Sequence, residues 1–156
     1  MAWKKADVES RFSVRPPQLG DSRILSEADI ENFIDPWPSQ FFVSEILAEG
    51  RFNRLLVDPS GQLAAYLFCA WQYLDLHVLK VATTTRHRRA GLAKRLMRLA
   101  EEHACSVGGE SLTLEVRFDN VPAITLYETL GYTRRGIRPS YYPNGEDAII
   151  MTRQLS

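Results

Sequence analysis

The sequence predicts an α/β protein of the α+β type, built on a mixed central sheet with helices on both faces. The first observation behind this fold class is the length of 156 residues, which suits one domain spanning residues 1–156. The second is periodicity, because apolar residues recur at helical spacing in some stretches and alternate with polar residues in others. The third is the order of these stretches: one strand, two helices, three strands, helix, strand, helix and two strands.

Local signals indicate where these elements begin and end. Ser26 has the chemistry of a helix N-cap, and the turn 58–61, Asp-Pro-Ser-Gly, predicts a hairpin. Asn120 is expected to cap a short helix that carries Pro122 in its first turn, where a missing N–H costs little. The expected elements are strand 12–15, helices 26–34 and 39–49, strands 52–57, 63–71 and 75–83, helix 91–107, strand 112–118, helix 121–130, and strands 132–137 and 147–152.

Composition argues against several classes of protein. Nineteen basic residues balance nineteen acidic ones, so no overall field attracts nucleic acid or an anionic membrane. Cys69 and Cys105 lie in apolar segments without metal-ligand spacing, which indicates two buried thiols in a reducing compartment. The polar residues 1–10 are expected to form a loose tail rather than a signal peptide. No run of about 20 apolar residues occurs, so the protein is expected to be cytoplasmic.

A basic turn with a glycine precedes the long helix. Its residues are Arg88, Arg89, Ala90, Gly91, Leu92, Ala93 and Lys94. Small side chains let the backbone approach a bulky anion, which the first N–H groups and the positive end of the helix dipole would face. The turn lacks the features of a P-loop or a dinucleotide fold, which disfavours ATP and NAD. Taken alone, it fits either a pyrophosphate site or an ordinary helix start with a solvated basic rim.

The same turn carries a family resemblance. Arg88-x-x-Gly91-x-Ala93 resembles the acetyl-CoA signature of the GNAT acetyltransferases, which reads Gln or Arg, two residues, Gly, one residue, then Gly or Ala. Further segments resemble the bacterial ribosomal-protein alanine N-acetyltransferases of this superfamily. These segments are Pro36-Trp37, residues 114–117, Asn120, residues 123–124, 126–128 and 130–132, Arg138, residues 141–143 and residues 146–151. Residues 84–87 depart from the usual sequence before the signature.

The resemblance implies the GNAT (acyl-CoA N-acyltransferase) fold, with a mostly antiparallel sheet, and acetyl-CoA as the co-substrate. Residues 88–94 would then bind the diphosphate of the coenzyme. The backbone of Val81, Ala82 and Thr83 would splay from the neighbouring strand and bind the pantetheine arm, and Asn120 would contact the coenzyme besides capping its helix. The histidines show no ligand spacing, so no metal is expected.

Two residues match the catalytic groups of the resembled family. Glu115 occupies the polar face of strand 112–118 and matches the general base that receives the proton of the amine, often through a water. Tyr127 lies on the inner stripe of helix 121–130 and matches the acid that protonates the departing CoA thiolate. By pattern alone, an ordinary surface glutamate and a packed tyrosine explain these two positions.

The resemblance also places Trp37, Arg138, Tyr141 and Tyr142 in the groove that binds the acceptor. The expected reaction is direct transfer of an acetyl group, in a ternary complex, to the N-terminal α-amine of a ribosomal or other protein. A lysine or small-molecule amine as acceptor, and a non-catalytic acyl-CoA-binding domain, stand as alternatives. The protein is expected to be a monomer or weak dimer, without nucleic-acid or membrane partners.

Overall fold

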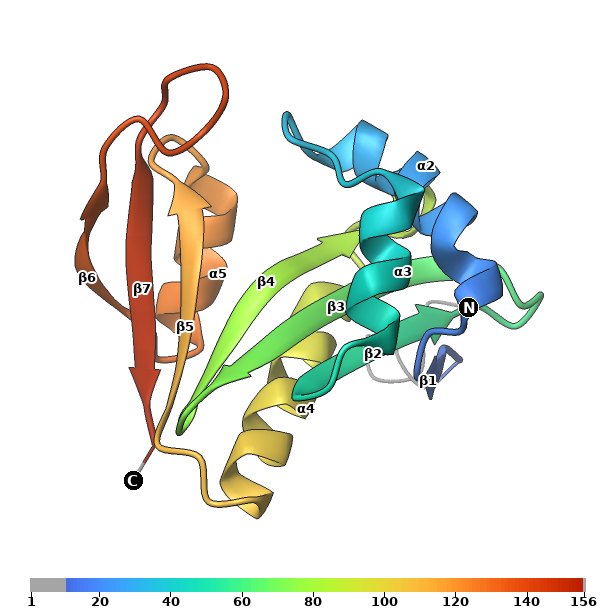
Figure 1. Cartoon of the computed structure of the whole chain (residues 1–156), viewed down its shortest axis with the longest axis horizontal. Helices are drawn as coiled ribbons and strands as arrows, with labels where there is room; N and C mark the ends of the chain where they lie inside the picture. Colours follow the sequence, from blue (N-terminus) through green and yellow to red (C-terminus); the bar gives the residue numbers. More distant parts are fainter. Residues whose placement is uncertain (1–10, 156) are drawn as a thin grey trace, which may run out of the picture.

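A seven-stranded sheet in the order β1-β2-β3-β4-β5-β7-β6 runs through the protein (Figure 1). The computed structural model describes residues 11–155, so the tail expected over residues 1–10 lies outside the described part. Neighbouring strands pair antiparallel throughout, except that β4 and β5 are parallel. The predicted mixed, mostly antiparallel sheet is therefore confirmed.

The elements follow one another in the predicted order, with two added 3-10 turns, η1 and η2. Their bounds are β1 Ser13–Arg15, η1 Leu19–Asp21, α2 Ser22–Asn32, α3 Ser39–Leu47, β2 Arg51–Val57, β3 Leu63–Gln72, β4 Asp75–Thr83, η2 Thr85–His87, α4 Leu92–Ser106, β5 Ser111–Arg117, α5 Val121–Thr129, β6 Thr133–Arg138 and β7 Ala148–Gln154. None of the helices within residues 11–155 has the length and apolar character that a membrane crossing requires.

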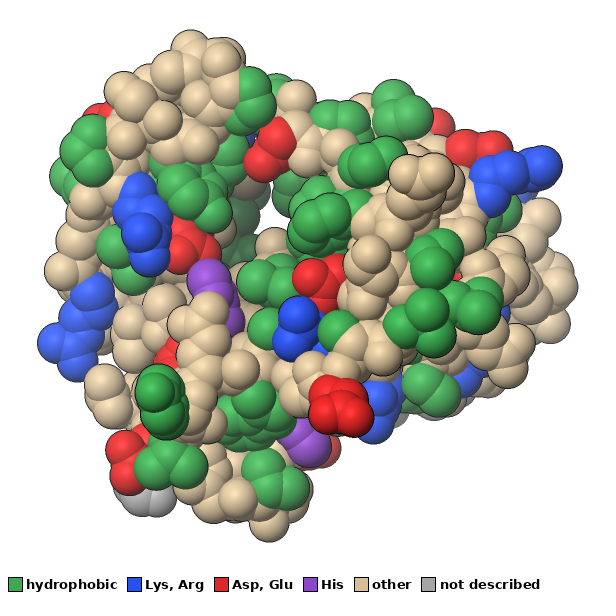
Figure 2. All heavy atoms as spheres, in the orientation of Figure 1, with side chains coloured by type: hydrophobic (Ala, Val, Ile, Leu, Met, Phe, Trp, Pro, Cys, Tyr) green, Lys and Arg blue, Asp and Glu red, His purple; other side chains and the backbone are tan. Residues whose placement is uncertain are grey.

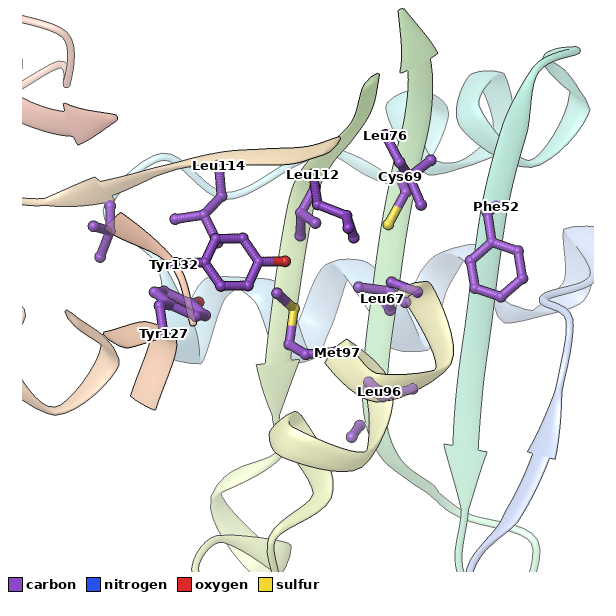
Figure 3. Packing of buried hydrophobic residues seen from close by; sticks show 14 of the residues in the cluster. Phe52, Leu67, Cys69, Leu76, Leu96, Met97, Leu112, Leu114, Tyr127 and Tyr132 are labelled. Atoms are coloured by element: carbon purple, nitrogen blue, oxygen red, sulfur yellow. The ribbon is translucent and has the colours of Figure 1, made fainter. Parts of the chain in front are cut away.

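Helices cover both faces of the sheet and create two hydrophobic cores. The larger core lies under α4 and α5, where Met97 extends toward Tyr132 and Tyr127 lies beside Tyr132 (Figure 3). The smaller core lies on the opposite face, where α2 and α3 pack on β2 and β3 around aromatic side chains. Burial of these apolar side chains supplies the main driving force for folding.

The two central strands separate along their length. β4 and β5 pair only from Asp75 to Val78 and from Ser111 to Leu114, and beyond these residues they diverge (Figure 1). A β-bulge in the β3–β4 pairing coincides with the separation, because Lys80 faces Phe68 and Val78 faces the next residue of β3. The strands therefore form an open V at the centre of the sheet.

The bulge also reverses the faces of β4. Leu76 and Val78 belong to the larger core under α4, whereas Ala82 belongs to the smaller core under α2 and α3. One extra residue, Leu79, shifts the two-residue alternation of the strand by one step. Lys80 is thereby turned away from the larger core and toward α2.

Three local expectations were wrong. Ser26 does not cap α2, because the helix starts at Ser22, after the η1 turn that Asp21 stabilises by accepting hydrogen bonds from Gln18 and Arg15. Helix α3 ends at Leu47, before Gly50, which has a left-handed backbone (φ 66°) next to β2. Of the two thiols predicted to be buried, Cys69 is buried but Cys105 is exposed.

The hairpin and the second capped helix are confirmed. β2 and β3 pair antiparallel across the predicted turn. The side chain of Asn120 accepts a hydrogen bond from the backbone N–H of Ala123 (3.3 Å), and Pro122 lies in the first turn of α5. These are local features, which short stretches of sequence specify through turn and cap chemistry.

Gly109→Ala is expected to lower the free energy of unfolding by about 1–3 kcal/mol, the usual cost of overpacking. A Cβ at Gly109 would lie 2.8 Å from the ring of Trp71 and 3.0 Å from the carbonyl oxygen of Ala104. Gly20→Ala is the control, since no atom lies within 4 Å of its added Cβ. Urea unfolding measures both, and equal effects would contradict the packing argument.

Candidate active site

A cavity of about 740 Å³ opens where β4 and β5 diverge. Its walls come from the α2–α3 loop, β4, β5, α5 and the loop between β6 and β7. Figure 2 shows the hollow between the half of the molecule that contains β5–β7 and the half that contains α2 and α3, with apolar and charged side chains around it. Most of the sequence-predicted site residues line this cavity: Trp37, Val81, Ala82, Thr83, Arg88, Glu115, Asn120, Tyr127, Tyr141 and Tyr142.

Glu115 presents a nearly buried carboxylate to the cavity, at the point where its strand leaves β4. Its Oε2 lies 2.6 Å from His77 Nε2, and its Oε1 accepts a hydrogen bond from Arg138 Nε at 3.2 Å. The amide nitrogen of Gln72 lies 3.3 Å from His77 Nδ1. A carboxylate oxygen can only accept, so His77 Nε2 donates the hydrogen bond to Glu115.

The ionisation of Glu115 results from opposing effects. Burial acts to raise the pKa of the carboxyl group, but the hydrogen bond and charge of His77, with those of Arg138, outweigh burial and hold the pKa below its ordinary value. Glu115 is therefore a carboxylate at neutral pH. It can accept a proton in the cavity without first losing one.

Tyr127 reaches the cavity from α5 and is buried among the residues of the larger core. Its ring centroid lies 5.9 Å from that of Tyr132. Burial raises the pKa of the Tyr127 phenol to about 12. The hydroxyl group is therefore protonated across the whole neutral range and can serve as a proton donor but not as a base.

One edge of β4 is open to the cavity. Val81, Ala82 and Thr83 pair on one side with β3, and they lie past the last residue of β4 that pairs with β5. Their backbone groups on the β5 side therefore face the cavity instead of another strand. An extended chain of amides, such as a pantetheine arm, could hydrogen-bond to such an edge.

The basic turn lies between η2 and α4. Arg89 and Gly91 both adopt left-handed backbone angles (φ 68° and 73°), and α4 starts at Leu92. The first N–H groups of a helix have no partner within the helix, so this tight turn and helix start form an anion-binding arrangement. Among the predicted residues 88–94, only Arg88 lines the cavity, and it also hydrogen-bonds Asn32 of α2 at 2.9 Å.

Two loops face each other at the other end of the cavity. The α2–α3 loop contributes Asp35 and Trp37, and Trp37 packs on Phe68 of the sheet. The β6–β7 loop contributes Tyr141 and Tyr142, whose rings meet edge to face at 5.0 Å. Arg138 contacts the cavity only through Glu115, because its own side chain is exposed and does not line the wall.

Sequence reasoning missed two polar groups at this site. His77 was set aside because the histidines lack metal-ligand spacing, yet it pairs with Glu115 across the sheet. Lys80 lines the cavity and forms a buried ion pair with Asp29 of α2. The sequence could have indicated this pair, because Lys80 and Asp29 each interrupt an apolar pattern. Charged side chains are rarely buried unless they are paired, so two such interruptions predict an ion pair.

Comparison with known proteins identifies the family. The family model described as "Acetyltransferase (GNAT) family" matches residues 22–132. A candidate ribosomal protein bS18-alanine N-acetyltransferase of Bacillus subtilis is 32% identical over 145 residues, which cover 92% of this chain and 96% of the relative. An N-alpha-acetyltransferase of Sulfurisphaera tokodaii is 27% identical over an alignment of 168 residues. This alignment covers 99% of this chain and 100% of the relative.

The structural comparison gives the same result. The crystal structure of the ribosomal-protein-S18-alanine N-acetyltransferase from Escherichia coli superposes with a TM-score of 0.85 and 29% identity, covering 93% of this chain and 94% of that one. The family match extends over α2 to α5 and so includes β4, the basic turn and both candidate catalytic residues. The chain therefore belongs to the acetyltransferase (GNAT) family.

Proposed function

We propose that this protein transfers the acetyl group of acetyl-CoA to the N-terminal α-amine of a protein, with a ribosomal protein as the favoured acceptor. The observation that carries the proposal is the convergence of three features in one cavity: the Glu115 carboxylate, the protonated Tyr127 phenol and the open edge of β4. The names of the relatives support the choice of an α-amine, since they are N-alpha-acetyltransferases and ribosomal-protein alanine N-acetyltransferases.

The coenzyme would lie along β4 and the basic turn. Residues 88–94 would bind the diphosphate through the helix start, with Arg88 and Lys94 adding positive charge. The backbone of Val81, Ala82 and Thr83 would bind the pantetheine arm, and one of their N–H groups would polarise the acetyl carbonyl. Asn120, which lines the cavity at the start of α5, would contact the coenzyme from the other side.

The chemistry then needs two proton transfers. Glu115 accepts a proton from the attacking amine, directly or through a water, while the amine nitrogen bonds to the acetyl carbon. The bond from this carbon to sulfur breaks, and the proton of the Tyr127 hydroxyl goes to the leaving thiolate. His77 and Arg138 hold the carboxylate in place through its two oxygens.

An α-amine suits this site better than a lysine. With a pKa near 8, roughly 10% of an α-amine is neutral at pH 7, whereas about 0.04% of a lysine side chain is neutral. Glu115, whose pKa is held low, is a weak base and is suited to an amine that loses its proton readily. Trp37, Tyr141 and Tyr142 would form the groove for the residues that follow the amine.

The direct test is release of free thiol from acetyl-CoA with three peptides. A peptide that begins with Ala is expected to be acetylated, whereas the same peptide with a blocked N-terminus and a blocked peptide containing lysine are not. Mass spectrometry locates the added acetyl group. Turnover only on the lysine peptide would overturn the choice of acceptor, and acetyl-CoA binding without turnover on any amine would identify a non-catalytic domain.

Glu115→Gln is expected to lower kcat by about 10²-fold or more, because the amide cannot accept the proton of the amine. Affinity for acetyl-CoA, measured by calorimetry, should change little. Glu101→Gln is the matched control, since it removes a carboxylate that pairs with Arg153 outside the cavity. Unchanged turnover in Glu115→Gln would remove this residue from the mechanism.

The pH profile of kcat/KM is expected to rise with a midpoint near 8, the pKa of the acceptor amine. Glu115 adds no limb in this range because its pKa is lowered and it is ionised throughout. Tyr127 adds no fall below about pH 10, because the pKa of its phenol is raised to about 12. An acceptor amine with a lower pKa should move the midpoint of the profile to lower pH. A midpoint that stays fixed would mean that a group of the enzyme, not the acceptor amine, causes the rise in kcat/KM.

A further inference from the structure

A buried hydrogen-bond cluster joins the α2–α3 loop to the sheet behind the cavity. At its centre is Asp29 of α2, whose side chain is completely buried. Its Oδ1 accepts a hydrogen bond from the hydroxyl of Tyr66 at 2.7 Å, and its Oδ2 accepts one from the backbone N–H of Trp37 at 2.7 Å. Lys80 donates a further hydrogen bond to Oδ2. One carboxylate thus ties together β3, β4 and the α2–α3 loop.

Lys80 also contacts the aromatic side chains of the loop. Its ammonium nitrogen lies 4.0 Å from the ring centroid of Phe33 and 4.6 Å from that of Trp37, at cation–π distance from both. All three residues line the cavity. The position of the loop therefore depends on a lysine that reaches this face only because of the bulge at Leu79.

Stability alone does not account for this pair. Burying two charges costs several kcal/mol each, and apolar residues of similar volume often replace buried ion pairs without loss of stability. What a carboxylate adds is direction, because it fixes the donors around it at defined angles. Here the donors belong to the strand that would bind the coenzyme and to the loop that would face the acceptor.

The opposite wall of the groove is held differently. The β6–β7 loop, which contributes Tyr141 and Tyr142, is tied by pairs that are partly open to solvent, such as Arg117 with Glu146 at 3.2 Å. The side chains of this pair are 35% and 27% exposed, against 4% and 0% for Lys80 and Asp29, so salt screens it more strongly than the buried pair. The α2–α3 loop is therefore the fixed wall against which an acceptor would be placed.

We propose that Asp29 and Lys80 are positioning residues for the acceptor, and that their buried pair holds the α2–α3 loop as the fixed wall of the acceptor groove. The inference rests on the proposed function, because the occupant of this groove is the N-terminus of the acceptor protein. It adds that acceptor affinity, rather than coenzyme affinity or proton transfer, depends on the pair.

The test compares Lys80→Met, Asp29→Asn and the double variant with the native protein, using acetyl-CoA and the peptide that begins with Ala. Each single variant leaves one partner buried without the other and should lower Tm. The double variant removes both charges and should recover part of the lost Tm. It should still show an acceptor KM raised about 10-fold, with the acetyl-CoA KM and the pH midpoint unchanged.

Glu45→Gln is the matched control for stability. It breaks the partly buried pair of Glu45 with Arg51, which joins α3 to β2 outside the cavity, and should lower Tm without changing the acceptor KM. The positioning role would be refuted if the acceptor KM rose in every variant whose Tm falls, Glu45→Gln included. It would also be refuted if the acceptor KM of the double variant equalled the native value.

Hydrogen exchange provides a readout that does not need turnover. The amide proton of Trp37, which donates to Asp29, should exchange at least about 10-fold faster in the double variant, while the amides of α4 keep their rates. Slow exchange of this proton in the double variant would overturn the inference. Lack of activity in the native protein with any α-amine peptide would instead refute the proposed function, and the exchange result would still decide how the loop is held.

Discussion

The site depends on the separation of β4 from β5. Parallel neighbours in a sheet normally satisfy each other's backbone groups along their whole length, and here they do so only as far as Val78 and Leu114. Past this point, the backbone of β4 is open to a ligand and Glu115 of β5 lines the cavity. The bulge at Leu79 coincides with the separation and sets which face each later residue of β4 occupies.

Two buried carboxylates near the cavity have different surroundings and therefore different capacities. Asp29 accepts hydrogen bonds from Tyr66, Trp37 and Lys80, does not line the cavity and is suited to hold structure. Glu115 lines the cavity, and its hydrogen bonds with His77 and Arg138 leave it able to receive a proton there. The fold thus separates a carboxylate that positions from one that can react, although both are nearly inaccessible to solvent.

Much of the fold could be predicted from local patterns. The β2–β3 hairpin, β4, α4 and the cap of α5 are each specified by a short stretch, because turn, cap and periodicity signals act over a few residues. The predicted start of α2 was wrong, because the η1 turn and the burial of Leu25 extend this helix toward the N-terminus. The grouping of Glu115 and Tyr127 around one cavity followed from family resemblance, since pattern alone fits a surface glutamate and a packed tyrosine.

The sequence by itself determined the order of the elements, the basic turn ahead of α4 and the membership of the family, because short contiguous stretches of residues specify each of these. Only the tertiary structure decided that His77 pairs with Glu115 and Lys80 with Asp29, residues that are 38 and 51 positions apart. A two-residue alternation places Lys80 in the apolar core with Leu76 and Val78. One extra residue in the pairing of β4 with β3 reverses that assignment, and strand register is a property of the sheet, not of a single strand.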